Sequence, residues 1–532
     1  MQQLIRGALI AIEVALLSSL VLATRCANYQ DVFVGKNIYF TDADCYARMT
    51  RVRMCAKNPG LIVRHHDFEN YPDGTTPHTT APLDYLILGF SIVISAANLS
   101  RVGEGAFDYV DLAGALISPL LALLGAWFLW WWSRELKFRY RWAMLILYAI
   151  SPILVHGSEL GRPDHQSLSM LLVIVGICAE WTPAREPTKQ WSAVSGIAWA
   201  LAIWVSAYEP LVLFLLLLAV KFGQVRSLHF APARRIGWIL FGAIIAIALL
   251  IERRIPSFAI FGSGATFKNW ADTIGELAHV SPANPAWLHW TGYLLLIVPF
   301  LFWLVFRKRS IVASGGHAFL ISVLLVATYC LTIWQTRWAY FFALIFAIML
   351  PMLLAPIKSS VAVWIAFVLS IFPILRDWDE RLWPNEFELA RRIEQRSESW
   401  QIRELAVGLK SQQIQPVLAP WWLSPAITYW SAQPSVAGSS HESLNGIADT
   451  ARFFLADDWQ QGAKILKDHA VVWVMAYDSQ RLGQNSAAIM GAKPSGRELC
   501  FVLDRTPSRA PPFLVFAAQN SGVKLYRVVN KL

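Results

Sequence analysis

Long runs of apolar residues, each near the length of a membrane-spanning helix, recur along the chain up to residue 375. A helix needs about 20 largely apolar residues to cross a bilayer, so each run predicts a span. The runs cover residues 4–24, 109–131, 142–157, 166–181, 190–206, 209–222, 236–252, 289–306, 316–334, 338–355 and 359–375. A further stretch, 83–98, either spans the membrane or lies along its surface. About 11 to 13 spans are expected on this criterion.

The pattern changes from about Arg376, where charged and polar residues become frequent. Stretches with helical periodicity and short strand-like runs then alternate. The helical stretches are 386–410 and 447–468, and the strand-like runs are Val471–Met475, Leu499–Leu503, Phe513–Phe516 and Val523–Val529. The prediction is a polytopic α-helical membrane domain over residues 1–375, followed by a soluble α/β domain over 376–532.

Lys and Arg residues cluster in every second loop, and such clusters mark the cytoplasmic side of a membrane. The clusters contain Arg134, Lys137, Arg139 and Arg141; Arg185 and Lys189; Lys221, Arg226, Arg234 and Arg235; and Arg307, Lys308, Arg309 and Lys358. If residues 83–98 do not cross the membrane, the remaining loops and the C-terminal domain lie on the opposite, outer side. These loops are a large first loop, 25–108, a loop at 253–288, and the short loops 158–165, 207–208 and 335–337. Arg253 and Arg254 depart locally from this rule.

Composition supports the membrane prediction. Hydrophobic residues make up 56% of the 532 residues and charged residues only 15%, which is more apolar surface than one soluble core of this size can bury. The net charge of +10 is divided among the loop clusters instead of forming one basic stripe, which argues against a nucleic-acid partner. Of the six cysteines, Cys45 and Cys55 are close enough in sequence to form a disulfide outside the cytoplasm, or to remain free thiols.

The first predicted outward loop contains two carboxylates only two residues apart, Asp42 and Asp44, followed later by His78. Carboxylate oxygens are the ligands that Mg²⁺ and Mn²⁺ prefer, so this pair is a candidate cation site. The alternative is a solvated acidic turn neutralised by Arg48 and Arg51.

Three further outward segments contain candidate residues. Asp164, followed by His165, lies at the mouth of a span, where a carboxylate is costly unless it is paired, binds a cation or caps the helix. Glu276 lies in the loop 253–288. Arg337 ends another span, where a guanidinium can bind a phosphate through two hydrogen bonds or anchor the helix at the interface.

Together these residues suggest one chemistry. Carboxylates from three loops can fix a divalent cation, and the cation with Arg337 can stabilise the charge that develops on a leaving phosphate. A site at the edge of the bilayer can receive a lipid-linked donor laterally. The sequence therefore favours transfer from a lipid-phosphate donor.

The order of these motifs resembles that of the catalytic subunit family of oligosaccharyltransferase, a GT-C membrane glycosyltransferase. The matching segments are Asp44-Cys45-Tyr46, Gly161-Arg162-Pro163-Asp164, Thr273-Ile274-Gly275-Glu276, Arg337-Trp338 and Trp421-Trp422. They follow the family order over nearly the whole chain. Thr273-Ile274-Gly275-Glu276 is the sharpest match.

The resemblance implies that Asp44, Asp164 and Glu276 bind a catalytic Mn²⁺ or Mg²⁺, with Asp44 and Glu276 also activating the acceptor. It implies that Arg337 binds the donor phosphate, and that Trp421 and Trp422 contact the acceptor. Asp42, His78 and His165 are secondary candidates.

Two departures distinguish this chain from the family pattern. Leu423 replaces the aspartate that follows the two tryptophans and helps to recognise the hydroxyl of an N-x-S/T acceptor, so recognition of that sequence is in doubt. Gln166 stands where a second acid is common. Trp421 and Trp422 can equally be core aromatics of the α/β domain.

The prediction is a multi-pass glycosyltransferase, inverting and metal-assisted, which uses a polyprenyl-phosphate or polyprenyl-pyrophosphate donor. The expected location is a bacterial inner membrane, with the active site and C-terminal domain facing the periplasm. The acceptor, whether protein, glycan or lipid, is open. One alternative is protein N-oligosaccharyltransferase. A transporter or flippase is an alternative of another class, although no matching pair of halves is visible, and a scaffold without activity is a third.

Overall fold

The computed structural model describes residues 2–98, 101–102, 105–182, 188–224, 232–255, 264–307 and 315–529. The loop residues Arg185, Arg226, Lys308 and Arg309, and part of the loop 253–288, lie outside these ranges. The contacts divide the chain into two compact units. Unit 1 comprises residues 1–35, 112–253 and 279–385, and unit 2 comprises residues 36–111, 254–278 and 386–532.

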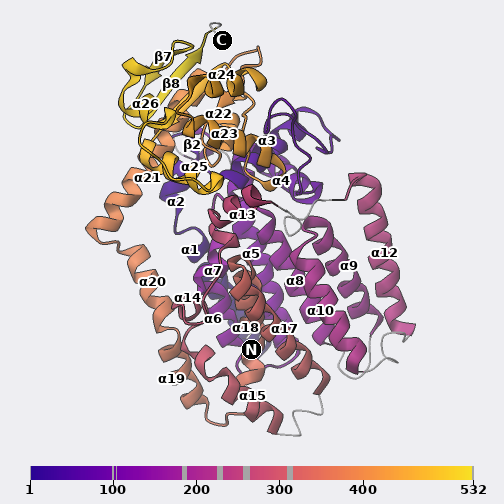
Figure 1. The fold of residues 1–532 in the computed structure, drawn as a ribbon. Helices are drawn as coiled ribbons and strands as arrows, with labels where there is room; N and C mark the ends of the chain where they lie inside the picture. Colours follow the sequence, from indigo (N-terminus) through magenta and orange to yellow (C-terminus); the bar gives the residue numbers. More distant parts are fainter. Residues whose placement is uncertain are drawn as a thin grey trace. The chain divides into compact units, whose positions relative to one another are not determined.

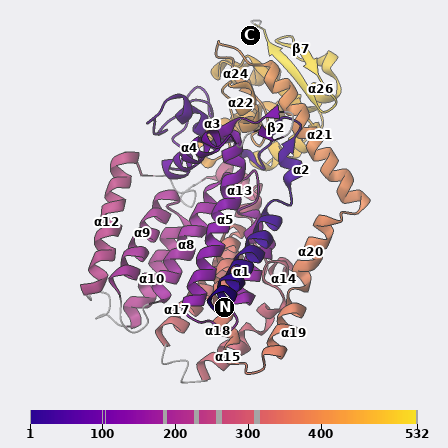
Figure 2. The same ribbon diagram turned by 180° about the vertical axis from the view of Figure 1, so that it is seen from behind.

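Unit 1 consists almost entirely of helices (Figure 1, Figure 2). Its main elements are α1 (Gln2–Arg25), α2 (Tyr29–Val32), α5 (Tyr109–Glu135), α6 (Arg141–Ile150), α7 (Pro152–His156), α8 (His165–Trp181), α9 (Lys189–Val205), α10 (Glu209–Gln224), α12 (Pro232–Glu252), α14 (Ala286–Thr291), η3 (Tyr293–Ile297), α15 (Val298–Arg307), α17 (Gly315–Trp334), η4 (Thr336–Trp338), α18 (Ala339–Leu354), α19 (Ser360–Ser370) and α20 (Phe372–Leu382). Strand β1 (Phe33–Val34) follows α2. Every apolar run expected to span the membrane is helical here, although several runs are divided into shorter helices.

Within the described ranges, four helical segments are long and apolar enough to cross a membrane: Gln3–Arg25, Tyr109–Glu135, Pro232–Glu252 and Thr336–Leu354. The pair α19 and α20 passes the same test together, but it is bent by 45° between Ser370 and Phe372. Six shorter apolar helices are also present among the described residues. The chain is therefore an integral membrane protein with several spans, and the count of 11 to 13 stays a prediction.

Helix α18 lies at the centre of unit 1, since every residue of it except Met352 is buried. A helix that is apolar on all sides needs neighbours on all sides, and α6, α7, α15 and α17 supply them. Trp287, Tyr329 and Phe342 pack as an aromatic cluster beside it, with ring centroids 4.6 and 5.2 Å from that of Trp287.

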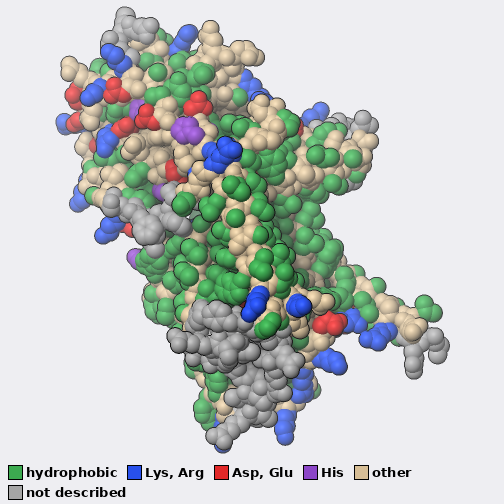
Figure 3. All heavy atoms as spheres, turned by 90° about the vertical axis from the view of Figure 1, so that its right-hand side faces the viewer, with side chains coloured by type: hydrophobic (Ala, Val, Ile, Leu, Met, Phe, Trp, Pro, Cys, Tyr) green, Lys and Arg blue, Asp and Glu red, His purple; other side chains and the backbone are tan. Residues whose placement is uncertain are grey.

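Helices α9 and α12 approach closely because both present glycine at the crossing point. A Cβ atom at Gly196 would collide with the backbone of Gly237, and one at Gly237 would collide with the backbone of Ser192. Small residues allow membrane helices to pack by backbone contact. The remaining face of α12 exposes large apolar side chains such as Ile239 and Leu250, and Figure 3 shows hydrophobic side chains over much of the visible helical surface.

Unit 2 contains a four-stranded sheet and the helices around it. Its elements are β2 (Asn37–Ile38), α3 (Ala43–Lys57), α4 (Ala81–Ala96), β3 (Arg101–Val102), β4 (Gly105–Ala106), α13 (Ala265–Asp272), η2 (Gly275–Leu277), α21 (Glu386–Gly408), β5 (Val417–Leu418), α22 (Ser424–Ser431), η5 (His441–Ser443), α23 (Leu444–Leu455), α24 (Trp459–Asp468), β6 (Trp473–Tyr477), α25 (Ser479–Met490), α26 (Leu499–Arg505), η6 (Pro507–Arg509), β7 (Leu514–Gln519) and β8 (Val523–Val528). The sheet order is β5-β6-β8-β7, with β5 parallel to β6 and the other pairs antiparallel.

Several elements of the C-terminal region agree with the sequence pattern, and two do not. The strands β6, β7 and β8 and the helix α21 form where they were expected. Leu499–Leu503 was expected to be a strand and is instead the start of helix α26, because a short apolar run does not distinguish a buried strand from a buried helix. The expected helix 447–468 is two helices, with Asp458 capping the second through the Gln460 amide.

Cys45 and Cys55 are not joined by a disulfide, and both are buried. They lie ten residues apart on the same helix, α3, and a rise of about 1.5 Å per residue separates them by about 15 Å. A disulfide between them is therefore excluded by geometry. Cys55 instead donates a hydrogen bond to the Leu61 carbonyl, 3.3 Å away.

Residues of the first predicted outward loop pack inside unit 2 with residues from the C-terminal region. The Tyr71 amide donates to the Ser435 carbonyl at 3.1 Å, and the Ser435 amide donates to the Phe68 carbonyl at 3.0 Å. Nearby, the Asn70 side chain accepts from the Gly446 amide at 2.9 Å. These backbone bonds make the loop part of the core of the unit, whereas the sequence prediction assigned it to the membrane domain.

Candidate functional site

Asp164 caps helix α8 in unit 1. Its Oδ1 accepts from the His165 backbone amide at 2.6 Å, and His165 Nδ1 lies 2.7 Å from the same oxygen. The residue is 5% exposed, so the positive end of the helix and the imidazole together compensate a buried carboxylate. The helix cap considered from the sequence is present, and His165 is a partner of Asp164.

Arg337 lies in η4, in the short connection between α17 and α18. Its Nη2 lies 2.6 Å from Oε1 of Glu209, the first residue of α10. The guanidinium also stands over the Tyr208 ring, 5.4 Å from the centroid. The other Glu209 oxygen accepts from Ser206 Oγ at 2.8 Å. Glu209 therefore fixes the orientation of the arginine that was expected to bind the donor phosphate.

These two pairs form one cluster in unit 1, because Glu209 interacts electrostatically with both Arg337 and His165. Asp164, His165 and Arg337 are thus linked electrostatically through Glu209, and their roles in catalysis and phosphate binding stay predictions. The structure adds Glu209, which the sequence reasoning missed. The sequence does show Glu209 as an acid between two apolar runs, and a carboxylate at the end of a span needs a partner.

Asp42 and Asp44 have different positions at the start of α3 in unit 2. Asp42 is the N-cap, and its Oδ1 accepts from the Cys45 amide at 2.9 Å. Asp44 is exposed in the first helical turn and interacts electrostatically with Arg51. Since capping is the structural role expected of an aspartate here, Asp44 is the better candidate for binding a ligand.

Glu276 lies in η2 of unit 2, and its segment packs against one of the two candidate tryptophans. Ile274 and Trp421 belong to the same hydrophobic cluster. The Trp270 ring, just ahead of this segment, contacts the Trp421 ring edge-on at a centroid distance of 6.0 Å. The sharpest sequence motif and the tryptophan pair are therefore neighbours.

Trp421 and Trp422 point into different surroundings. The Trp421 indole donates to Asn485 Oδ1 at 3.0 Å. Trp422 packs against the core around the sheet and lies under the Arg481 guanidinium, 5.4 Å from the ring centroid. Both tryptophans are half-buried, and Leu423 is buried. They are part of the packing of unit 2, and their contact with an acceptor stays a prediction.

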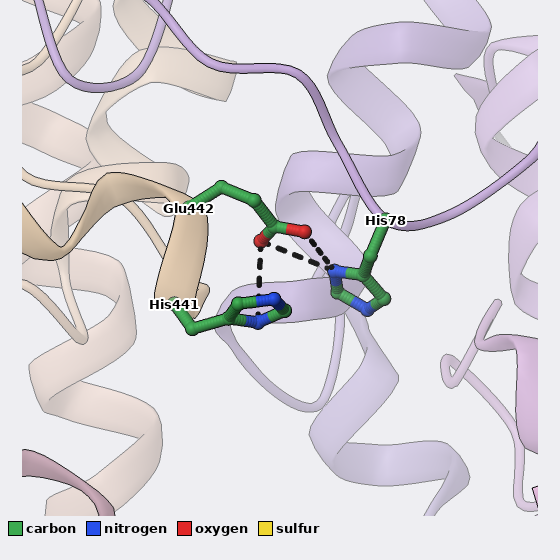
Figure 4. Close-up of side chains that lie close together, drawn as sticks. All are labelled: His78, His441 and Glu442. Carbon is green, nitrogen blue, oxygen red and sulfur yellow. Dashed lines mark hydrogen bonds and ion pairs between the residues drawn. The ribbon is translucent and has the colours of Figure 1, made fainter. Parts of the chain in front are cut away.

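His78 belongs to a cluster that the sequence did not reveal. Its Nδ1 lies 3.0 and 3.2 Å from the two carboxylate oxygens of Glu442, and His441 lies on the other side of that carboxylate (Figure 4). Neither residue from the C-terminal region was a candidate, because nothing in the sequence connects residues so far apart.

The predicted site residues are distributed over both compact units. Asp44, Glu276, Trp421, Trp422 and His78 belong to unit 2, and Asp164, His165 and Arg337 belong to unit 1. Each set is ordered by contacts within its own unit. Binding of one cation by Asp44, Asp164 and Glu276 together stays a prediction.

Comparison with known proteins gives a fold but no sequence relative: no family model matches the chain, and no curated protein sequence matches it. A solved oligosaccharyltransferase from Archaeoglobus fulgidus, tethered to an acceptor peptide containing an NVT sequon, aligns over 90% of this chain and 71% of its own, with a TM-score of 0.66 and 14% identity. A second structure of that enzyme, in complex with Zn and sulfate, aligns over 90% of this chain and 70% of its own, with a TM-score of 0.66 and 15% identity.

ArnT from Cupriavidus metallidurans, bound to undecaprenyl phosphate, aligns over 99% of this chain and 98% of its own, with a TM-score of 0.56 and 12% identity. The chain has the GT-C fold of these proteins. The expected fold class, a polytopic helical membrane protein with a C-terminal α/β region, is therefore confirmed.

Proposed function

We propose that this protein is a membrane glycosyltransferase that transfers a sugar or oligosaccharide from a polyprenyl-phosphate or polyprenyl-pyrophosphate donor to an acceptor. The reaction takes place on the periplasmic face of a bacterial inner membrane. The observation that carries the proposal is the GT-C fold, shared over at least nine tenths of the chain with an oligosaccharyltransferase and with a protein bound to undecaprenyl phosphate.

In this proposal Arg337 binds the donor phosphate. Its guanidinium is 17% exposed and is held by the buried Glu209, so it is oriented before a ligand arrives. An oriented, planar guanidinium can donate two parallel hydrogen bonds to two phosphate oxygens and loses little entropy on binding. Asp164 and His165 belong to the same cluster and extend the polar site in unit 1.

Asp44, Asp164 and Glu276 would hold a divalent cation, Mn²⁺ or Mg²⁺, which would neutralise charge on the leaving phosphate. Their oxygen ligands suit such ions, and one solved neighbour contains Zn. The bond between the anomeric carbon and the phosphate oxygen breaks, and the phosphate leaves with the electron pair. The acceptor attacks from the opposite face, which inverts the anomeric centre, and its proton passes to Asp44 or Glu276.

Protein N-glycosylation is a second candidate, because one neighbour was solved with a sequon peptide. The apolar, buried Leu423 weighs against the same mode of sequon recognition, since its side chain has no acceptor for a Ser or Thr hydroxyl. We therefore leave the acceptor class open between protein, glycan and lipid.

The test is transfer of a labelled lipid-linked sugar in proteoliposomes, with Mn²⁺ or with EDTA. Glu276→Gln and Arg337→Gln should each lower the rate by about 100-fold or more, the usual cost of removing one charge-stabilising group. Arg376→Gln is the matched control, because Arg376 is 69% exposed and pairs with Glu380 one turn along its own helix. EDTA should abolish transfer.

Transfer that both variants retain at the wild-type rate would refute the assigned site. If no acceptor class accepts the sugar but labelled lipid moves across the bilayer, the protein is a flippase.

A further inference from the structure

Three potential metal ligands converge in unit 2, apart from the acids assigned to catalysis. His78 comes from the first predicted outward loop, and His441 and Glu442 come from η5 in the C-terminal region (Figure 4). The His78 Nδ1 atom lies 3.0 Å from Oε1 of Glu442, and the His441 Nδ1 atom lies 3.4 Å from its Oε2. One potential ligand atom from each residue lies within 4.8 Å of the others.

We propose that His78, His441 and Glu442 bind one Zn²⁺ ion. Two imidazoles and one carboxylate are a recurring zinc ligand set that leaves a fourth position for water or another ligand. The site goes beyond the proposed glycosyl transfer and does not depend on it.

The distances fit this ion. Tetrahedral Zn²⁺ with nitrogen and oxygen ligands at about 2.0–2.2 Å places neighbouring ligand atoms roughly 3.3–3.5 Å apart. The two imidazole nitrogens lie 3.2 Å (His78) and 3.4 Å (His441) from the same carboxylate oxygen, Oε2 of Glu442, which is already close to that spacing. The ring centroids of His78 and His441 lie 5.3 Å apart at 37°, and a nitrogen of each ring lies within 4.8 Å of the other.

The surroundings support a ligand role for Glu442. Its side chain is only 8% exposed, and its Oε2 accepts from Ser440 Oγ at 2.6 Å. His78 is 33% exposed and provides the route by which an ion enters.

A second histidine in the same unit shows the contrast with an ordinary ion pair. His469 Nε2 lies 3.0 Å from Asp449, and its Nδ1 lies 2.5 Å from the Tyr71 carbonyl oxygen. Each ring nitrogen of His469 is therefore hydrogen-bonded to a different protein group, Asp449 on one side and the Tyr71 carbonyl on the other. At Glu442, by comparison, two imidazoles from separate chain segments face one carboxylate.

Zinc at this position would join distant segments of unit 2. His78 and Glu442 are 364 positions apart in the sequence. The carbonyl oxygens on either side of His78, those of Pro77 and Thr79, accept hydrogen bonds from the Arg254 guanidinium. The ion would therefore fix the first loop to the C-terminal region at the point where the loop preceding Glu276 also attaches.

The experiment uses the full chain in detergent with Asp44→Asn and Glu276→Gln, so that a catalytic cation does not contribute. The protein is stripped with EDTA, incubated with Zn²⁺ and desalted, and its metal content is measured by mass spectrometry. We expect one equivalent of zinc, which His441→Ala and Glu442→Gln each remove. His469→Ala, the matched control, should retain it.

X-ray absorption of the zinc-loaded protein should show nitrogen and oxygen neighbours at about 2.0–2.2 Å. Glu442→Gln keeps the size and hydrogen-bonding capacity of the side chain, so it separates loss of the ligand from loss of folding if His441→Ala is unstable. The proposal is overturned if the starting chain binds no zinc, or if Glu442→Gln binds as much as its parent. Neither outcome bears on sugar transfer.

Discussion

Replacing Glu69 with glutamine should change how the stability of unit 2 depends on pH. The Glu69 side chain lies in the first loop and accepts a hydrogen bond from the Ser439 amide at 3.0 Å. The residue is 2% exposed. Burial raises the pKa of its carboxyl to about 7, although the Ser439 hydrogen bond and the charge of Arg51 oppose this effect and nearby Glu442 adds to it.

The sign follows from proton linkage. In the unfolded chain the Glu69 carboxyl has its ordinary pKa of 4.5, whereas in the folded chain the pKa is about 7. Between these two values the folded state holds a proton that the unfolded state has released, so stability falls as the pH rises through this window. Below pH 4.5 the Glu69 carboxyl is protonated in both states and does not change the free energy of unfolding. Above pH 7 the full loss of stability from the buried, ionised carboxylate remains.

The size of this loss of stability follows from the same two pKa values. A difference of one pKa unit corresponds to 1.36 kcal/mol, so the penalty at pH 8 is about 3 kcal/mol at most. In a cooperative unit of about 250 residues, each kcal/mol shifts Tm by roughly 2–4 °C. Glu69→Gln keeps an oxygen for the Ser439 amide and cannot ionise, so it should remove this penalty.

The assay is thermal unfolding of both proteins in detergent from pH 5 to pH 8, followed by tryptophan fluorescence. The Tm of the variant minus that of the wild type should increase by roughly 5–10 °C over this range, because about 0.8 kcal/mol of the penalty is already present at pH 5. A Tm difference that is constant with pH, or one that decreases, would refute the assignment of a protonated buried carboxyl.

Two further predictions concern packing, and both are measured as Tm in detergent at pH 7. Asp84 lies 2.7 Å from the buried Arg48 and 3.6 Å from the buried Arg51. Asp84→Asn removes the carboxylate between these arginines and should cost about 3–5 kcal/mol, whereas Asp457→Asn at an exposed position should cost little. Equal effects would contradict the role of burial. Gly196→Leu should cost about 1–3 kcal/mol because its side chain would collide with Gly237. Gly242→Leu on α12, where a Cβ meets no other atom within 4 Å, is the control, and equal losses would show that the crossing is not tightly packed.

Much of the fold could be predicted from the sequence because a bilayer imposes a simple rule on it. Each apolar run had to be a helix, and each is helical in the structure. The same rule does not show how a run is divided. Ser370 and Phe372 flank a bend of 45° that hydropathy alone does not reveal. In the C-terminal region, Leu499–Leu503 was misassigned because tertiary context decides between strand and helix for so short a run.

The candidate site was predictable only where residues had recognisable neighbours in the sequence. Asp164 and Arg337 could be found from their positions at span ends, and the structure brings them into one cluster. Glu209 could not be assigned, because its role depends on a contact with a residue more than a hundred positions away. The same holds for His441 and Glu442, whose partner His78 lies in another part of the chain.

The assembly of unit 2 from three separate stretches of chain has a consequence for biogenesis. Phe68 and Tyr71 bond to Ser435, which the ribosome adds more than 360 residues later. At about 5–20 residues per second, these residues wait tens of seconds for their partner. The nascent first loop therefore exposes unpaired backbone and buried-type side chains such as Phe68 for that time.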